Sequence, residues 1–430
     1  MPESCKTLGP YVILEENGLE DLRGFMERTR EMFLSALRSA LRNEQADMEL
    51  TGEEWTALLK LAQTHKVLPL IFQAVHSCPS LAQLDSAYLA VLRRQVKQQV
   101  VLQTLRTGEF LELNRALREG GVRPLVVKGL VCRELYPHPD HRPSSDVDVL
   151  IRWEDFEICH RVMTELGMTA GTEDTSSYEI PYRKAGSPLY IELHKNLFPP
   201  ESAAYGDLNR FFAGIQSRAA EVNLRGEVVA TPCPTDHLFY LICHAFKHFL
   251  HSGFGIRQVC DIVLFARAYR EEVDWQCVFE NCEAIRAGKF AAAVFRIGEK
   301  HLGIESPAVF RAVAVDEGPM LEDLLVGGLY GDATLSRKHS SSITLDAVAA
   351  KKQGKRPRGA MAVSVFPPVK EMTWKYPYLK EKPWLLPLAW SQRLWRYARE
   401  TRTTADSSAA EAMKIGADRL ELMKTYGILP

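Results

Sequence analysis

Several features that mark common classes of protein are missing from this chain of 430 residues. No run approaches the roughly 18 uncharged apolar residues of a membrane-spanning helix, so we expect no association with a membrane. Residues 1–18 contain no basic segment followed by an apolar run, which argues against a signal peptide. Lysine and arginine (53) nearly balance aspartate and glutamate (54), so general polyanion binding is not expected. The nine cysteines form no Cys-x-x-Cys pair, and this scatter predicts reduced thiols in a cytoplasmic protein.

The chain is long enough for two or three domains, and the texture of its sequence changes along it. We expect a helical region over 1–118, an α/β core over 119–232 and a helical, histidine-containing region over 233–305. The remainder, 306–430, combines a polar, basic loop with a helical tail rich in proline and aromatic residues. This order predicts an α+β fold whose sheet is embedded in mainly helical N- and C-terminal regions.

Short apolar runs bounded by glycine or proline predict the strands of the core, and apolar residues three and four apart predict its helices. The expected strands are 123–128, 146–151, 178–183, 189–197 and 227–230, with helices over 130–135 and 154–166. In the N-terminal region, Thr51 and Glu54 have the spacing of a capping box, and 89–117 is a long helical pattern.

The segment 331–359 is polar and basic, and we expect it to form an exposed, mobile loop. Its basic run, Lys351–Arg358, is suited to contact RNA, but a solvated loop or a localisation signal is the favoured reading. The aromatic residues from Trp374 to Trp395 are spaced irregularly among prolines, which favours core or interdomain packing over base stacking.

Two pairs of polar residues stand one apart on expected strands. Asp146 and Asp148 flank Val147, and Glu192 and His194 flank Leu193. Side chains alternate along a strand, so each pair points to one face, with its members roughly 7 Å apart. If the two strands are neighbours, three carboxylates meet, and such a cluster favours a divalent cation. Oxygen ligands select Mg²⁺ or Mn²⁺, and Mg²⁺ takes further ligands from water and phosphates, which indicates phosphoryl or nucleotidyl transfer.

A second group of residues is suited to phosphate. Lys128 and Gly129 lie at the end of an expected strand, just before a helix, where a glycine lets backbone approach a phosphate. Lys128 adds a positive charge, and Arg142 with Ser144 and Ser145 precedes the carboxylates. These candidate site residues also have structural explanations without a function. Lys128 could face solvent, Arg142 could pair with Asp140, and Glu192 could pair with Lys195 or Arg183.

Four histidines share one face of the helix expected after residue 234: His237, His244, His248 and His251. Two histidines four apart can bind a metal, and a metal phosphohydrolase that uses a His-Asp dipeptide is one reading. The chain contains no His-Asp dipeptide, so we favour a helix that packs against the cleft. His194, His244, Lys247 and His248 are then candidate cleft-lining residues, and a partly buried amphipathic helix is the plain alternative.

These residues in this order resemble a known family. The motifs Val127-Lys-Gly-Leu130, Arg142-Pro-x-x-Asp-Val-Asp-Val-Leu150 and Ile191-Glu-Leu-His194 are similar to those of the bacterial uncharacterised nucleotidyltransferases, in the DNA polymerase β-like superfamily. The resemblance extends over about residues 51–425 and implies a mixed-sheet nucleotidyltransferase core. The superfamily usually has a Gly-Ser or Gly-Gly turn, where this chain has Lys-Gly.

The resemblance also implies roles for individual residues. Asp146 and Asp148 would hold two Mg²⁺ ions, and Glu192 would activate an acceptor hydroxyl or complete a metal shell. Lys128, Gly129 and Arg142 would hold the triphosphate, with Ser145 as a further hydroxyl donor. We therefore expect a Mg²⁺- or Mn²⁺-dependent transfer of a nucleoside monophosphate from an NTP, ATP being the first candidate, with release of pyrophosphate. The acceptor is left open, and the alternative is a non-catalytic module that binds a nucleotide or a partner.

Overall fold

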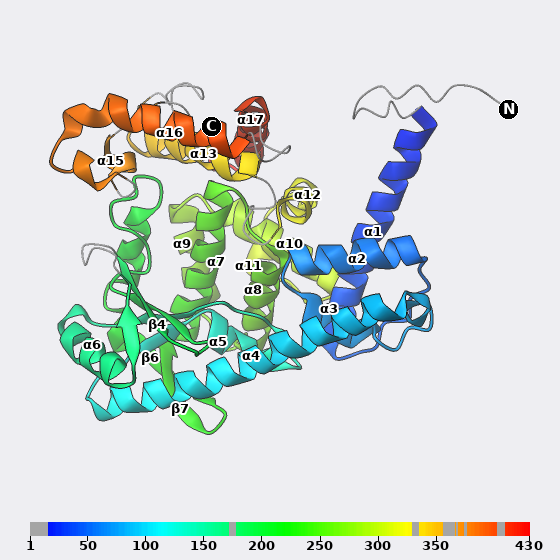
Figure 1. Cartoon of the computed structure of the whole chain (residues 1–430), viewed down its shortest axis with the longest axis horizontal. Coiled ribbons are helices and arrows are strands. Elements are labelled where there is room, and N and C mark those ends of the chain that lie inside the picture. The colour runs from blue at the N-terminus through cyan, green and yellow to red at the C-terminus, as the bar shows by residue number, and fades with distance from the viewer. Residues whose placement is uncertain are drawn as a thin grey trace.

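The computed structural model describes residues 16–171, 178–328, 335–355, 366, 369–373, 376–401 and 409–430. It has an α+β fold in which one seven-stranded mixed sheet is surrounded by helices (Figure 1), as the sequence predicted. None of the helices in these described ranges is both long enough and apolar enough to cross a membrane.

Four helices precede the sheet: α1 (Glu16–Arg42), α2 (Gly52–Thr64), α3 (Leu68–Val75) and α4 (Ser86–Glu119). The predicted capping box starts α2, because Thr51 Oγ1 accepts from the Glu54 N–H and Glu54 accepts from the Thr51 N–H. Helix α4 contains the predicted pattern 89–117 and runs from α3 to α6 along the lower edge of Figure 1. It thereby joins the N-terminal helices to the sheet.

The strands and the helices between them follow the predicted order. The strands are β1 (Leu125–Val127), β2 (Val147–Leu150), β3 (Met168–Ala170), β4 (Glu179–Lys184), β5 (Tyr190–His194), β6 (Ala219–Leu224) and β7 (Glu227–Pro232). Helix α5 (Gly129–Arg133) follows β1, and α6 (Phe156–Glu165) follows β2. Strands β3 and β6 were not predicted, since β3 is three residues long and polar Glu221 and Asn223 interrupt the apolar residues of β6.

The strand order is β3-β4-β5-β2-β1-β7-β6, so β2 and β5 are neighbours at the middle of the sheet. They run parallel, and Asp148 lies directly beside Glu192 in their register. On β2, Val147 and Val149 pack in a core with α4 and α6, which cover one face of the sheet. Because side chains alternate, Asp148 faces the opposite side, where Val127 of β1 packs in the larger core with α7 and α8.

The remaining helices follow the sheet. They are α7 (Pro234–His251), α8 (Ile256–Ala268), α9 (Trp275–Ala284), α10 (Gly288–Leu302), α11 (Ala308–Arg311), α12 (Gly318–Gly327), α13 (Leu335–Lys352), α15 (Val369–Met372), α16 (Leu386–Thr401) and α17 (Ala409–Thr425). Short 3₁₀ helices are η1 (Leu81–Gln83), η2 (Pro139–His141), η3 (Trp153–Asp155), η4 (Gly206–Phe212), η5 (Ile215–Arg218), η6 (Pro377–Leu379) and η7 (Pro383–Leu385).

The prediction of a mobile loop over 331–359 is wrong for its described part. Residues 335–352 form α13, and its Ser336, Arg337 and Thr344 side chains are buried against the rest of the molecule. The basic run continues to Lys355 within the described residues, and its last part, 356–358, lies outside them.

The aromatic residues that follow residue 373 differ in burial, so core packing, which the sequence favoured for them, applies to some and not to others. Tyr376 is buried in a small core with Leu379, whereas Trp384 and Trp395 are 71% and 67% exposed. Trp374 lies outside the described residues, as does Cys5. The eight described cysteines are free thiols, and six of them are buried.

Candidate functional site

Lys128 connects β1 to α5 in an unusual backbone conformation. Its φ of 55° and ψ of −125° fall in a region that residues other than glycine rarely adopt, at a cost of about 1–3 kcal/mol. Its N–H donates to His237 Nε2 at 3.1 Å, and His237 Nδ1 lies 3.0 Å from the Thr231 hydroxyl. Burial lowers the pKa of His237 to about 3, so this ring is neutral and carries its proton on Nδ1. The buried histidine therefore holds the turn.

The Lys128 ammonium lies inside the molecule, between a carboxylate and an imidazole. Its Nζ is 2.6 Å from Asp148 Oδ1 and 3.2 Å from His244 Nε2. Burial opposes its charge, but the attraction of Asp148, aided by Asp146 and Glu192, outweighs burial and raises the pKa of Lys128 well above its ordinary value. Burial and the positive charge of Lys128 together lower the pKa of His244, which is neutral and accepts from Lys128.

Asp148, Glu192 and His194 form a compact group at the β2–β5 pair. The two strands are neighbours, which the sequence left as a condition, and their pairing places one ligand atom of each residue within 4.8 Å of the others. His194 Nε2 lies 3.0 Å from Asp148 Oδ1 and 3.8 Å from Glu192 Oε2. This group differs from the predicted metal ligands, since it contains His194 in place of Asp146.

The charges of this group are balanced by the protein. Burial disfavours an ionised Asp148, but Lys128 and His194 outweigh burial and depress the pKa of its carboxyl. Burial likewise opposes a charged His194, yet its hydrogen bonds to Asp148 and Glu192 raise its pKa to about 9. For Glu192, burial and then the charge of Asp148 raise the pKa. The Lys128 ammonium and the His194 imidazolium thus face Asp148 and Glu192, and a third carboxylate, that of Glu179, lies 3.7 Å from His194 Nδ1.

The three residues are suited to a metal as well as to each other. Two carboxylates and a neutral imidazole can ligate a divalent cation, so His194 would have to give up its proton to join Asp148 and Glu192 as a ligand. Carboxylates fit Mg²⁺ and Mn²⁺, whereas an imidazole suits the transition metals better. The donor set therefore fits a divalent cation held by carboxylates and does not by itself select one metal.

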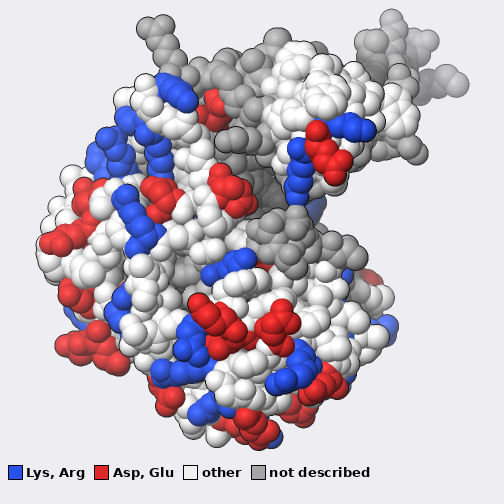
Figure 2. All heavy atoms as spheres, turned by 90° about the vertical axis from the view of Figure 1, so that its left-hand side faces the viewer, with Lys and Arg blue, Asp and Glu red and all other residues white. Residues whose placement is uncertain are grey.

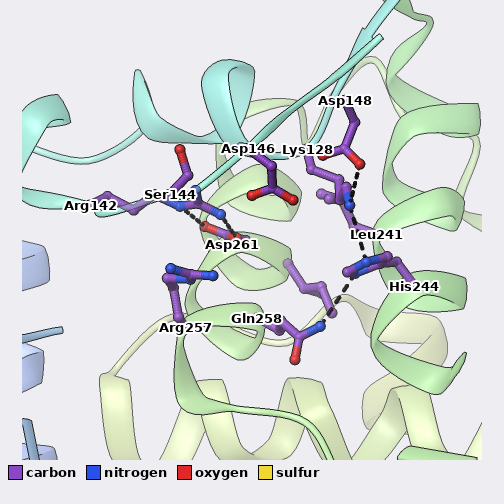
Figure 3. Close-up of a pocket in the computed structure, with 12 residues that line it drawn as sticks. Lys128, Arg142, Ser144, Asp146, Asp148, Leu241, His244, Arg257, Gln258 and Asp261 are labelled. Atoms are coloured by element: carbon purple, nitrogen blue, oxygen red, sulfur yellow. Dashed lines mark hydrogen bonds and ion pairs between the residues drawn. The ribbon is translucent and has the colours of Figure 1, made fainter. Parts of the chain in front are cut away.

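Asp146 precedes β2, and its carboxylate points into the cleft between Lys128 and Asp261 (Figure 3). It accepts a hydrogen bond of 3.0 Å from the hydroxyl of Ser145, which is exposed. Ser144 rather than Ser145 lines the cleft, and its carbonyl accepts from Gln103 Nε2 at 3.0 Å on α4. Helix α4 therefore positions the segment that carries Asp146.

Arg142 is buried and pairs with Asp261 of α8, not with Asp140 as the plain alternative supposed. Its Nε and Nη2 donate to the two Asp261 oxygens at 3.1 and 2.5 Å. The Tyr136 hydroxyl donates to the same carboxylate at 2.8 Å. Burial opposes its charge, but Asp261 outweighs burial and raises the pKa of Arg142. Its third nitrogen, Nη1, has no hydrogen-bond partner and lies beside Gly129, where a Cβ would come within 3.5 Å of it.

Helix α7 contributes unevenly to the cleft. His244 lines it, while His248 lies behind, with its Nε2 3.3 Å from that of His244. Lys247 Nζ is 5.7 Å from the ring centre of Tyr178 and 5.9 Å from that of Tyr205. Burial and the charge of Lys128 lower the pKa of Lys247. Glu192, finally, contacts His194 and forms no ion pair with Lys195 or Arg183 in the described part of the chain.

The family resemblance covers Arg257 to Asp261, but no site role was predicted for Arg257 and Gln258 of α8, which also line the cleft. Arg257 Nη1 donates to the Pro143 carbonyl at 2.5 Å, and Gln258 Nε2 lies 3.3 Å from His244 Nδ1. The one available signal was the spacing of four between Arg257 and Asp261, which places both on one helix face. More than 100 residues separate them from Pro143, so no local pattern connects the two segments.

Together these side chains surround a narrow cleft with a free volume of about 30 Å³ between the sheet and helices α7 and α8. Its lining residues are Lys128, Gly129, Arg142, Ser144, Asp146, Asp148, Leu241, His244, Arg257, Gln258, Asp261 and Ile262. Elsewhere, acidic and basic side chains are interspersed over the face shown in Figure 2. That mixture agrees with the near-zero formal net charge of −1.

Comparisons with known proteins give one family and two distantly similar structures. A family model described as an uncharacterised nucleotidyltransferase matches residues 51–303. Among solved structures, an antigenic nucleotidyltransferase-like protein from Paracoccidioides brasiliensis is similar at 15% identity and a TM-score of 0.30, covering 47% of this chain and 93% of that one. A tRNA-processing enzyme in an apo form is similar at 13% identity and a TM-score of 0.20, covering 73% of this chain and 96% of that one. No curated protein matches the sequence.

Proposed function

Because the chain belongs to the family of uncharacterised nucleotidyltransferases, we propose that it transfers a nucleoside monophosphate from an NTP to an acceptor and releases pyrophosphate. The observation that carries the proposal is the parallel register of β2 and β5, which sets Asp148 beside Glu192. Asp146, Lys128 and Arg142 converge on the adjoining cleft, so that carboxylates and phosphate-binding cations meet in one place.

In this proposal Asp148 and Glu192, with Asp146 or His194, hold Mg²⁺ or Mn²⁺. A divalent cation bound there would neutralise phosphate oxygens and orient the triphosphate. The Lys128 ammonium, which now compensates Asp148 at 2.6 Å, would turn to a phosphate oxygen. The neutral His244 ring, which accepts a hydrogen bond from the Lys128 ammonium, can accept it whether the ammonium faces Asp148 or a phosphate.

The phosphates would be held on the other side of the cleft. Arg142 Nη1 is a donor without a partner, and Asp261 fixes the rest of the guanidinium. Gly129 leaves room beside it for a phosphate oxygen to approach the backbone. Of the two serines, Ser144 faces the cleft, whereas Ser145 orients the Asp146 carboxylate.

Glu192 is suited to accept the proton of an acceptor hydroxyl. Its pKa is raised by burial and by Asp148, and a carboxylate with a raised pKa is a stronger base. His194, at 3.8 Å, would hold the orientation of this carboxylate. ATP is the first candidate donor, and the acceptor is open.

The test follows α-labelled NTPs, one base at a time, with Mg²⁺ or Mn²⁺ and a cell extract as the pool of acceptors. Asp146→Asn is the sharpest variant, because Asp146 is half-buried and accepts its hydrogen bond from the exposed Ser145, whereas its support of the buried Lys128 charge is secondary to that of Asp148. We expect it to lower pyrophosphate release and label transfer at least 100-fold with an unchanged melting temperature. Asp148→Asn should abolish activity too, but it also leaves the Lys128 ammonium without its carboxylate, so its folding must be measured beside it.

Glu221→Gln is the matched control, since Glu221 is an exposed carboxylate on the same sheet, paired with Arg123. Full activity of Asp146→Asn would refute the proposed chemistry. If the wild-type protein binds an NTP without releasing pyrophosphate, the non-catalytic binding module is the better account. The internal compensation of Asp148 by Lys128 and His194 is the observation that favours that second function.

A further inference from the structure

A second cavity lies on the opposite face of α7 from the cleft. It has a volume of about 350 Å³, against about 30 Å³ for the cleft. Leu241 and His244 face the cleft, whereas Phe246 and Leu250 face this cavity. At 100° per residue, the two pairs stand on opposite sides of the helix. The cavity is therefore separate from the proposed nucleotide site.

The walls of this cavity are apolar and well packed. Phe246 and Leu250 of α7, Ile285 after α9, Val348 of α13 and Ile428 near the C-terminus line it, and all five are buried. Seven of its eleven lining residues are apolar and four are charged, and a hollow of this size with both kinds of lining suits a small molecule that has an apolar and a charged part.

The rim of the cavity is positively charged. Arg286, Lys351 and Lys352 stand there with a single carboxylate, Asp207, which pairs with Lys352 at 2.5 Å. Within the described ranges, neither Arg286 nor Lys351 has a carboxylate within 4.0 Å. Two cations are thus left uncompensated beside an apolar hollow.

Arg286 also occupies a costly backbone position. It follows α9 with a φ of 60°, and its N–H donates to the Glu283 carbonyl at 2.9 Å, in the turn that ends the helix. Glycine is favoured at this position because a side chain in the left-handed conformation costs about 1 kcal/mol. An arginine held there projects its charge at the rim despite that cost.

We propose that this cavity binds an amphipathic anion: a carboxylate or phosphate head group on an apolar chain. The head group would pair with Arg286 and Lys351, and the chain would lie against Phe246, Leu250 and Val348. Such a ligand is complementary to both the cations and the apolar side chains of the cavity. A purely apolar molecule would leave the cations unpaired, and a purely ionic one would not cover the apolar side chains.

The test is calorimetric titration of the full-length protein with decyl phosphate and with decanoate, each below its micellar concentration. We expect one saturable site and a preference that identifies the head group. 1-Decanol and decyltrimethylammonium should bind at least tenfold more weakly, because they lack the anion. The double variant Arg286→Gln/Lys351→Gln should weaken binding of the anion about tenfold, as expected for the loss of two partly exposed ion pairs.

Two further variants separate this site from general adsorption. Val348→Trp should fill the cavity and remove binding, whereas Lys60→Gln, on the exposed face of α2, should leave it unchanged. The proposal fails if neither anion binds saturably, if decanol binds as tightly, or if the double variant binds like the wild-type protein. None of these outcomes depends on nucleotidyl transfer.

Discussion

At the scale of single residues, Lys128 combines two requirements that conflict. Its backbone has the φ of 55° that glycine tolerates, while its ammonium compensates the buried Asp148. Lys128→Gly and Lys128→Ala both remove the ammonium, but only alanine retains the backbone strain. We expect the glycine variant to be more stable than the alanine variant by about 1 kcal/mol, measured by urea unfolding. An alanine variant of equal or greater stability would show that the turn is not strained.

How far the sequence specified the site differs from residue to residue. The alignment of Asp148 with Glu192 followed from side-chain alternation once the two strands were assumed to be neighbours. The partner of Arg142 could not be predicted, because Asp261 lies 119 residues away and no short-range pattern links the two. Sequence proximity suggested Asp140 instead, which pairs with Arg225 at 2.7 Å.

At the scale of elements, strands were predictable where an apolar run was buried on both faces and bounded by breakers. This applies to β1 and β2, whose residues are all buried. The edge strand β6 has Glu221 and Asn223 on its exposed face, so it offered no apolar run to recognise. The sequence of α13 was interpreted as a loop because it is rich in polar residues. Several of these polar side chains are buried, and they form hydrogen bonds with the C-terminal end of α7.

The last carbonyls of α7 have no partner within their own helix, and side chains from two distant helices satisfy them. Thr344 Oγ1 lies 2.7 Å from the Leu250 carbonyl and 3.0 Å from that of His251. Arg337 Nε donates to the Ser252 carbonyl at 2.7 Å, and Arg419 of α17 donates to that of Phe249. These contacts tie α13 and α17 to the helix that carries His244.

Thr344→Val tests this arrangement, because valine keeps the shape of threonine and removes its hydroxyl. We expect the free energy of unfolding to fall by about 1–2 kcal/mol, since a buried carbonyl loses its donor. Thr64→Val on α2 is the matched control: its hydroxyl is exposed and bonds only within its own helix, to the Lys60 carbonyl. Equal stability of the two variants in urea would mean that the carbonyls of α7 find other donors.

At the scale of the whole molecule, the helical regions on either side of the sheet form one core with it. The larger core contains residues of α1–α3, of β1 and of α7–α10. The sequence predicted the order of these regions but not that they share one core. The apolar face of a helix shows that the helix packs against something, but not which other helix it contacts. Histidines buried in this common core should make its stability depend on pH.

His65 and His237 are buried and His251 is half-buried, and the loss of solvent lowers their pKa values to about 4, 3 and 4. In the unfolded chain each titrates near 6.5, so below that pH the unfolded state binds more protons than the folded state. Their contribution to stability is therefore complete above about pH 7 and is lost as the pH falls from 6.5 towards 4. Between pH 7.5 and 5.5 each should contribute a loss of about 1 kcal/mol.

His65→Gln isolates one of these contributions. Glutamine does not titrate and can still donate to the Leu325 carbonyl, which lies 3.2 Å from His65 Nε2. The loss of unfolding free energy between pH 7.5 and 5.5 should become smaller by about 1 kcal/mol in this variant. If His65→Gln lost as much unfolding free energy between pH 7.5 and 5.5 as the wild-type protein, His65 would be protonated within the folded protein. Water would then have to reach its ring.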